Sequence, residues 1–86
     1  MHEIQYTITD ENGIHARPAG QFVAVLQKFS SAITVIKKDG ASCDGKKLFT
    51  LMKLRVKANE TITVRAEGDD EEAAVNAAAE FLKANM

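Results

Sequence analysis

The apolar residues of this chain change their spacing along its length, and that change constrains the fold more than any other feature. Ile4, Tyr6 and Ile8 alternate with polar residues, which is the period of a half-buried strand. From Ala16 the spacing becomes three and four, typical of a helix that buries one face. The helical set consists of Ala19, Phe22, Val23, Leu26 and Phe29. Pro18 fits this helix only in its first turn, where its missing N–H costs little.

The middle of the chain predicts a hairpin and a short helix. Strand-like alternation returns at residues 32–37, and Asp39-Gly40 is a strong hairpin signal. We therefore expect residues 41–44 to pair back as a short strand. The segment 46–54, KKLFTLMKL, has the apolar spacing of a short helix.

The last part of the chain predicts one more strand and a long helix. Residues 61–66 alternate again, and Asp69 with Glu72 three positions later predicts an N-cap pair after Gly68. The expected order is therefore β-α-β-β-α-β-α over a single domain, residues 1–86. Four strands with amphipathic helices predict an α+β open-faced sandwich, a mainly antiparallel sheet covered on one face.

Composition narrows the class of protein. With 86 residues, 45% apolar and 27% charged, the chain is expected to form one globular domain with a modest core. No apolar run approaches the roughly 20 residues of a membrane span, and the first residues lack a basic-then-apolar signal pattern. The single cysteine, Cys43, cannot form an internal disulfide, so we expect a cytoplasmic protein.

The net charge of −1 conceals an uneven distribution. Residues 15–57 carry nine Lys and Arg against Asp39 and Asp44, a net charge of +7. The remainder has a net charge of −8, from ten acidic residues against Arg65 and Lys83. Such asymmetry can mark a face for anionic partners, and it can equally be ordinary solvated charge.

The stretch NGIHARPAG, residues 12–20, predicts an anion site. Asn12-Gly13 supplies turn chemistry, and His15 then falls at the start of the expected helix. A helix N-terminus offers unpaired N–H groups and partial positive charge, and Arg17 adds a guanidinium that can hold phosphate oxygens bidentately. Because neutral imidazole is a competent nucleophile, we predict that His15 accepts a phosphoryl group. The alternative is that His15 is an ordinary surface residue before a helix.

Several chemistries are excluded. The chain has no GxxxxGK[ST] loop and no kinase-type motifs, so the phosphoryl group must come from another protein or a small donor. His2, His15 and Cys43 have no metal-ligand spacing, and we expect no metal and no cofactor. Cys43 is expected to be a small interior residue of its strand. A nucleic-acid-binding domain that uses the +7 segment remains an alternative, weakened by only five aromatic residues and no aromatic-rich strand motif.

The stretches GIHARPAGQFV, KLFTLMKL and AEGDDEEAAV, together with the element order, resemble the HPr family. These are histidine-containing phosphocarrier proteins of the bacterial phosphoenolpyruvate-dependent sugar phosphotransferase system. The resemblance implies that enzyme I phosphorylates Nδ1 of His15, and that the phosphoryl group then passes to a histidine of an enzyme IIA component. It also implies that Arg17 stabilises the phosphate with support from Ala16 and Pro18. The implied fold is four antiparallel strands with three helices on one side.

The resemblance further implies a docking surface for enzyme I and enzyme IIA on the first two helices. An apolar centre of Leu48 and Phe49 ringed by cations would suit acidic partners. The matching residues are Gly20, Ala24, Lys28, Lys46, Lys47, Leu48, Phe49 and Leu51. Leu51 has the alternative of a core position, whereas we expect Phe49 to be exposed. We expect a monomer that neither inserts into membranes nor binds nucleic acid.

Two positions depart from the family pattern. A serine that one branch of the family phosphorylates as a regulatory mark is replaced by Lys47, preceded by Lys46, so we expect no such regulation. Arg55 stands where the family commonly has glycine. These departures leave open a second reading, a diverged paralogue whose partner interactions matter more than transfer from His15.

Overall fold

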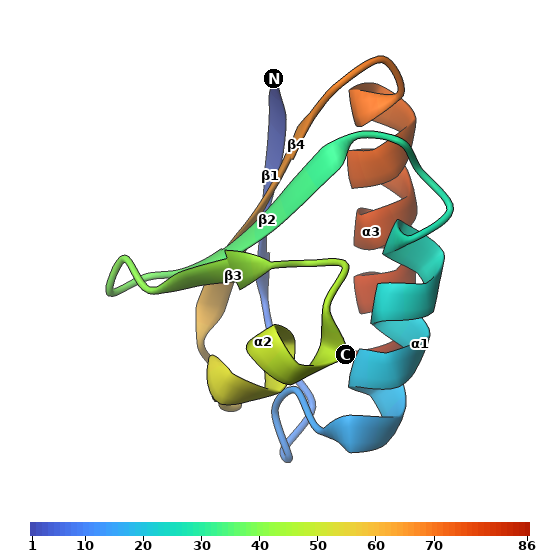
Figure 1. The fold of residues 1–86 in the computed structure, drawn as a ribbon. Helices are drawn as coiled ribbons and strands as arrows, with labels where there is room; N and C mark the ends of the chain where they lie inside the picture. Colours follow the sequence, from blue (N-terminus) through green and yellow to red (C-terminus); the bar gives the residue numbers. More distant parts are fainter.

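The computed structural model describes residues 1–86, and its elements follow the predicted order (Figure 1). They are β1 (His2–Thr7), α1 (Ala16–Leu26), β2 (Ala32–Lys37), β3 (Ser42–Asp44), α2 (Leu48–Lys53), β4 (Thr61–Glu67) and α3 (Glu71–Asn85). The first strand ends at Thr7, and Ile8, the last apolar residue of the alternating set, is fully buried just beyond it. The sequence prediction of seven elements is confirmed.

The four strands form one antiparallel sheet in the order β1-β4-β2-β3. The last strand in the sequence, β4, lies between β1 and β2 and pairs with both, so it connects the N-terminal strand to the rest of the sheet. One cross-strand row runs from Ile4 to Val64, Val35 and Cys43. The predicted antiparallel pairing is therefore confirmed.

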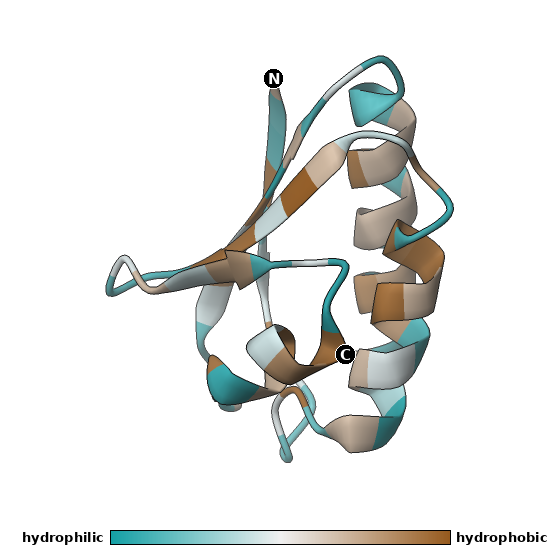
Figure 2. Cartoon of the chain, in the orientation of Figure 1, coloured by the Kyte–Doolittle hydropathy of each residue, from teal (hydrophilic) through white to brown (hydrophobic).

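The core lies between one face of this sheet and the helices. Side chains alternate across a strand, so Ile33 and Val35 of β2 share the covered face with Ile62 and Val64 of β4. Helices α1 and α3 pack side by side over this face (Figure 1), and the Phe22 and Phe81 rings stack with centroids 5.4 Å apart. Figure 2 shows the most hydrophobic stretches on β2, α1 and α2. Full burial of a side chain such as Phe22 contributes roughly 1.5–3 kcal/mol to stability.

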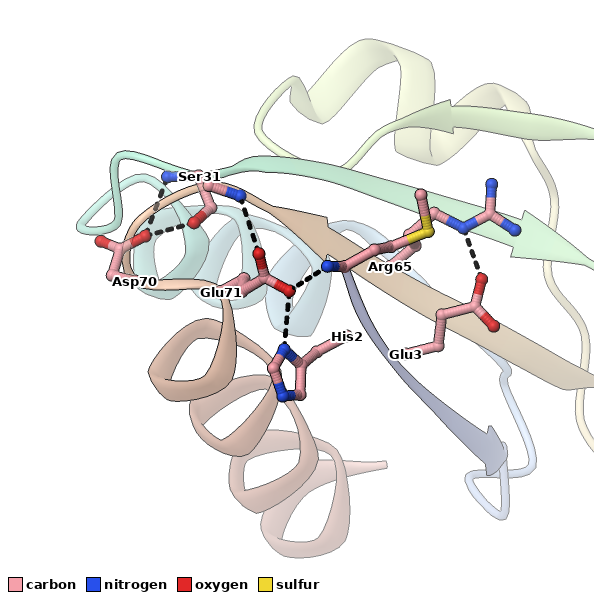
Figure 3. Close-up of polar contacts among 8 residues, drawn as sticks. His2, Glu3, Ser31, Arg65, Asp70 and Glu71 are labelled. Carbon is pink, nitrogen blue, oxygen red and sulfur yellow. Dashed lines mark hydrogen bonds and ion pairs between the residues drawn. The ribbon is translucent and has the colours of Figure 1, made fainter.

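The start of α3 differs from the prediction. Its N-cap is Asp70, and Asp69 and Glu72 are exposed rather than paired across a capping box. The Asp70 carboxylate makes no bond to α3 and accepts a hydrogen bond from the Ser30 amide at 2.8 Å. It also accepts from the amide (2.9 Å) and the hydroxyl of Ser31, as Figure 3 shows. These donors, the Ser31 hydroxyl foremost, lower the pKa of Asp70 to about 2. The loop between α1 and β2 therefore competes successfully for the carboxylate that would have capped the helix.

A second carboxylate ties the first strand to α3 (Figure 3). Glu71 Oε2 lies 2.5 Å from the Met1 amino group and 2.6 Å from Nδ1 of His2. The amino group, followed by His2, lowers the pKa of Glu71 to about 2. On the open face of the sheet, Arg65 Nε donates to Glu3 at 2.5 Å across the β1–β4 pair. The first three residues of the chain are thus held by the start of α3 and by β4.

Candidate functional site

The loop before α1 contains the predicted Asn12-Gly13 turn, and Asp10 organises it. The Asp10 carbonyl accepts from the Gly13 amide at 2.9 Å, while its Oδ1 accepts from the Asn12 amide at 2.9 Å. Gly13 has φ +65°, and a Cβ at this position would lie 2.3 Å from the Val56 carbonyl oxygen. Only glycine meets both requirements without strain.

Two anchors fix this loop to the rest of the molecule. On one side, the Ile14 amide donates to the Val56 carbonyl at 3.0 Å. On the other, the Thr9 and Asp10 amides donate to the Met86 carbonyl at 2.7 and 3.0 Å. The His15 side chain therefore projects from a backbone that is held at several points, and precise positioning of a reactive side chain requires such support.

His15 is the N-cap of α1, as the sequence predicted. Its backbone is extended (φ −126°, ψ 174°), and its carbonyl accepts from the Ala19 amide at 2.9 Å. Its side chain makes no capping bond, and the amides of Ala16 and Arg17 have no acceptor within the chain. Pro18 has no amide hydrogen to satisfy, so the amides of Ala16 and Arg17 are left for an anion at the helix terminus.

The imidazole of His15 is half-exposed and has one charged neighbour, Asp10. Its Nε2 lies 3.6 Å from Oδ2 of Asp10, and Nδ1 has no hydrogen-bond partner. The ring borders a depression of about 300 Å³ at the start of α1. This depression is lined by Asp10, His15, Arg17, Pro18, Gln21 and Asn85. The Arg17 side chain is exposed and has no carboxylate within ion-pair distance, so its guanidinium is free to meet an anion.

Sequence reasoning missed three residues of this depression: Asp10, Gln21 and Asn85. Asp10 has a detectable signal, because an aspartate two residues before Asn-Gly commonly accepts a hydrogen bond from the turn it begins. That pattern would predict its contact with Asn12, although not its approach to the imidazole. Asn85 belongs to the far end of the chain, and only the return of α3 to this loop brings it near.

The second helix presents part of the apolar surface expected of it. Phe49 is 83% exposed and Leu48 is 39% exposed, which confirms the expected exposure of Phe49. Leu51 is completely buried in the core, so its assignment to a docking surface is wrong. The side of α2 that carries Leu51 packs into the core together with Leu54, which follows the helix, so only Leu48 and Phe49 are left exposed.

The lysines assigned to this surface differ in availability. Lys46 is half-buried, and its Nζ donates to the Phe29 carbonyl at 2.5 Å. Its charge therefore interacts with a carbonyl just after the C-terminal end of α1. Gln27 adds a bond from its Nε2 to the Lys46 carbonyl at 2.9 Å. Lys47 is the N-cap of α2 and Lys28 follows α1; both are exposed and unpaired.

The part of α1 assigned to the docking surface carries two small residues. Ala24 is exposed, and Gly20 is half-buried with open space where a Cβ would lie. Helices α1 and α2 are in contact.

The structure also describes residues and helices relevant to other chemistries. No three His, Cys, Asp or Glu side chains come together as metal ligands. Burial raises the pKa of the Cys43 thiol, and the side chain packs against the core as predicted. None of the helices has the length and apolar character needed to cross a bilayer.

The open-faced α+β sandwich places a half-exposed histidine, free amides and an unpaired arginine at one helix N-terminus, and comparisons with known proteins place the chain among the small phosphocarrier proteins. Residues 2–84 match the family model described as "PTS HPr component phosphorylation site". Phosphocarrier protein HPr of Mycoplasma pneumoniae is 42% identical over 77 residues, covering 90% of this chain and 88% of the relative.

Solved structures agree with this class. A crystal structure of HPr-C-His from Thermoanaerobacter tengcongensis superposes with a TM-score of 0.92 at 38% identity, covering 98% of this chain and 93% of that one. An HPr dimer from the same organism gives a TM-score of 0.76 at 38% identity, over 98% of this chain and 95% of that one. The chain belongs to the HPr family of the phosphotransferase system.

Proposed function

We propose that His15 carries a phosphoryl group on Nδ1, taking it from phosphorylated enzyme I and passing it to enzyme IIA components during phosphoenolpyruvate-dependent sugar uptake. The single observation that supports this most strongly is the arrangement around the ring. Nδ1 is unpaired, Nε2 faces Asp10, and the free amides of Ala16 and Arg17 lie at the same helix terminus. A phosphocarrier needs these elements and little more, since phosphoryl transfer depends chiefly on positioning and charge stabilisation.

Each group has a defined task in this transfer. The Asp10 carboxylate favours the tautomer with the proton on Nε2, which leaves the lone pair of Nδ1 to attack phosphorus. As the new N–P bond forms, the bond from phosphorus to the donor's histidine breaks. The Arg17 guanidinium and the α1 terminus then stabilise the phosphate oxygens. The reverse sequence delivers the group to the next histidine, so the protein is a carrier with a covalent intermediate and requires no cofactor.

Both partners would approach over α1 and the exposed part of α2. Leu48 and Phe49 provide an apolar centre, and Arg17, Lys28 and Lys47 surround it with unpaired positive charge. Gly20 and Ala24 leave the surface of α1 flat enough for close approach. Partners with acidic rims would be attracted over a distance and released quickly, as a shuttle requires.

We further propose that this protein is not regulated by phosphorylation at the start of α2. Lys47 occupies the N-cap of that helix and offers no hydroxyl. The nearest hydroxyl, that of Thr50, lies 3.0 Å from the Asp44 carbonyl and 2.9 Å from the Lys47 carbonyl, so it is already engaged. The single, half-buried Cys43 is compatible with a cytoplasmic carrier, which we propose to be a monomer.

The two histidines of the chain allow a controlled test. Incubation with phosphoenolpyruvate, Mg²⁺ and enzyme I should add the mass of one phosphate, in an acid-labile and base-stable linkage. His15→Ala should abolish this addition, whereas His2→Ala should retain it, because His2 lies on β1 beside Glu71. Arg17→Ala should fold normally and be phosphorylated more slowly. An unmodified wild-type protein, or a His15→Ala variant that still gains phosphate, would refute the proposal.

A further inference from the structure

Arg55 adopts a backbone conformation that disfavours its own side chain. It has φ +54° and directly follows Leu54, the C-cap of α2, with its amide donating to the Met52 carbonyl at 3.2 Å. This is the position after a helix where glycine is most favoured, because a Cβ is strained in the left-handed region. A large side chain here lowers stability, and a binding role of that side chain would explain the cost.

That use is not found inside the molecule. The Arg55 side chain is exposed, and its guanidinium makes no hydrogen bond and no ion pair within the chain. The only polar contact of the residue beyond its own turn is through its backbone carbonyl, which accepts from Lys37 Nζ at 3.5 Å. The guanidinium is therefore available to a partner.

Arg55 stands next to the histidine loop. Val56, its neighbour in sequence, accepts the hydrogen bond from Ile14, and His15 follows Ile14 directly. Each of the two functional side chains is thus one residue away from the same backbone bond. Figure 1 shows the segment after α2 and the loop before α1 at the same end of the molecule. Arg55 also follows directly after α2, the helix that exposes Phe49.

The charges around Arg55 are mostly positive. Lys53 and Lys57 stand two positions to either side, both exposed and unpaired. The neighbouring acidic residue, Glu60, is engaged by Lys37 at 3.4 Å and by the Lys57 amide at 2.8 Å. We call Lys53, Arg55 and Lys57 the cationic segment; its complement is a surface of carboxylates.

We propose that Arg55 is a specificity-determining residue that docks an acidic surface of the phosphoryl-donor protein, an inference that rests on the proposed carrier function. The donor is the favoured occupant because it meets the unphosphorylated protein. In that state no phosphate offsets the positive charge of Arg17 and the α1 terminus, so attraction to carboxylates is greatest. Arg55 acts on encounter and binding and takes no part in the transfer itself.

The test measures phosphorylation by enzyme I at varied carrier concentration, at low and at high salt. Arg55→Gly should lower kcat/KM by about 3–10-fold at low salt with kcat nearly unchanged, and salt should remove the difference. Arg55→Lys, which keeps the charge, should behave much like wild type. Lys38→Ala is the matched control: it removes one exposed, unpaired cation from the hairpin beside the open face of the sheet, and should leave kcat/KM nearly unchanged.

A second readout tests the strain independently of transfer. Arg55→Gly should raise Tm by several degrees, because the left-handed backbone favours glycine. If wild type is phosphorylated but Arg55→Gly keeps the wild-type kcat/KM, the inference fails while the carrier function stands. Equal losses in Arg55→Gly and Lys38→Ala, a loss confined to transfer toward the acceptor, or an unchanged Tm would also overturn it. Failure of the wild-type protein to accept phosphate would overturn the proposed function instead.

Discussion

Replacing Gly13 with alanine tests whether the histidine loop depends on its close packing against residues 56 and 57. The new Cβ would lie 2.3 Å from the Val56 carbonyl oxygen and 2.8 Å from the Lys57 Cα, both backbone atoms that cannot rotate away. Since Gly13 also has φ +65°, the substitution meets steric and conformational opposition at once. The loop must move, and the bond from Ile14 to Val56 is the first to be lost.

The expected magnitude follows from these separate effects. A non-glycine residue in the left-handed region costs roughly 1–2 kcal/mol. Losing the bond between Ile14 and Val56 costs about another 1 kcal/mol. Alanine also lowers the conformational entropy of the unfolded chain, which raises the free energy of unfolding by roughly 0.4–1 kcal/mol. We therefore expect Gly13→Ala to lower the free energy of unfolding by about 2 kcal/mol, more if the backbone cannot relax.

Urea unfolding followed by circular dichroism measures this loss, and Gly20→Ala is the matched control. Gly20 lies within α1 with no atom within 4 Å of its Cβ position, so alanine there should raise stability by about 0.5–1 kcal/mol. Opposite signs for two glycine-to-alanine changes would identify the loop contact as the cause. A Gly13→Ala protein within about 0.5 kcal/mol of wild type, the range of an ordinary surface substitution, would refute the reasoning.

Two further predictions concern the core and the α3 terminus. In urea unfolding, Leu51→Ala should lower the free energy of unfolding by about 2–4 kcal/mol, whereas Phe49→Ala should change it by less than about 0.5 kcal/mol. In binding calorimetry, Phe49→Ala should weaken the binding of enzyme I. The reverse pattern would place Leu51 at the surface. Because the pKa of Asp70 falls to about 2 on folding, its carboxylate stabilises the protein fully above pH 4, and that contribution is lost as the pH falls from about 4 to about 2. Asp70→Asn should flatten the decline of Tm over this range, and an unchanged profile would contradict the role of its bonds to Ser31.

The fold was accessible from the sequence because its strands and helices differ in hydrophobic period. The alternation of β4 and the three-and-four spacing of α1 each describe one buried face, and tertiary packing agrees with both. The capping of α3 was not accessible in the same way. Asp69 and Asp70 are equally suited to a cap by type, and the carboxylate of Asp70, the N-cap residue, instead accepts from Ser30 and Ser31, which are remote in sequence.

The candidate site divides along the same line. His15 and Arg17 could be predicted because helix-terminus chemistry is local. Leu51 was misplaced because a six-residue helix is too short for its period to distinguish the buried side from the exposed one. The approach of Asp10 to the imidazole depends on how two backbone segments meet, and no spacing in the sequence encodes it.

The most direct test of the central claim is the identity of the nitrogen that receives phosphate. After phosphorylation by enzyme I and phosphoenolpyruvate, nitrogen-15 and phosphorus-31 NMR of uniformly labelled protein distinguishes the two imidazole nitrogens. We expect the phosphoryl group on Nδ1 of His15, with Nε2 protonated toward Asp10. Phosphate on Nε2, or on any residue other than His15, would contradict the account.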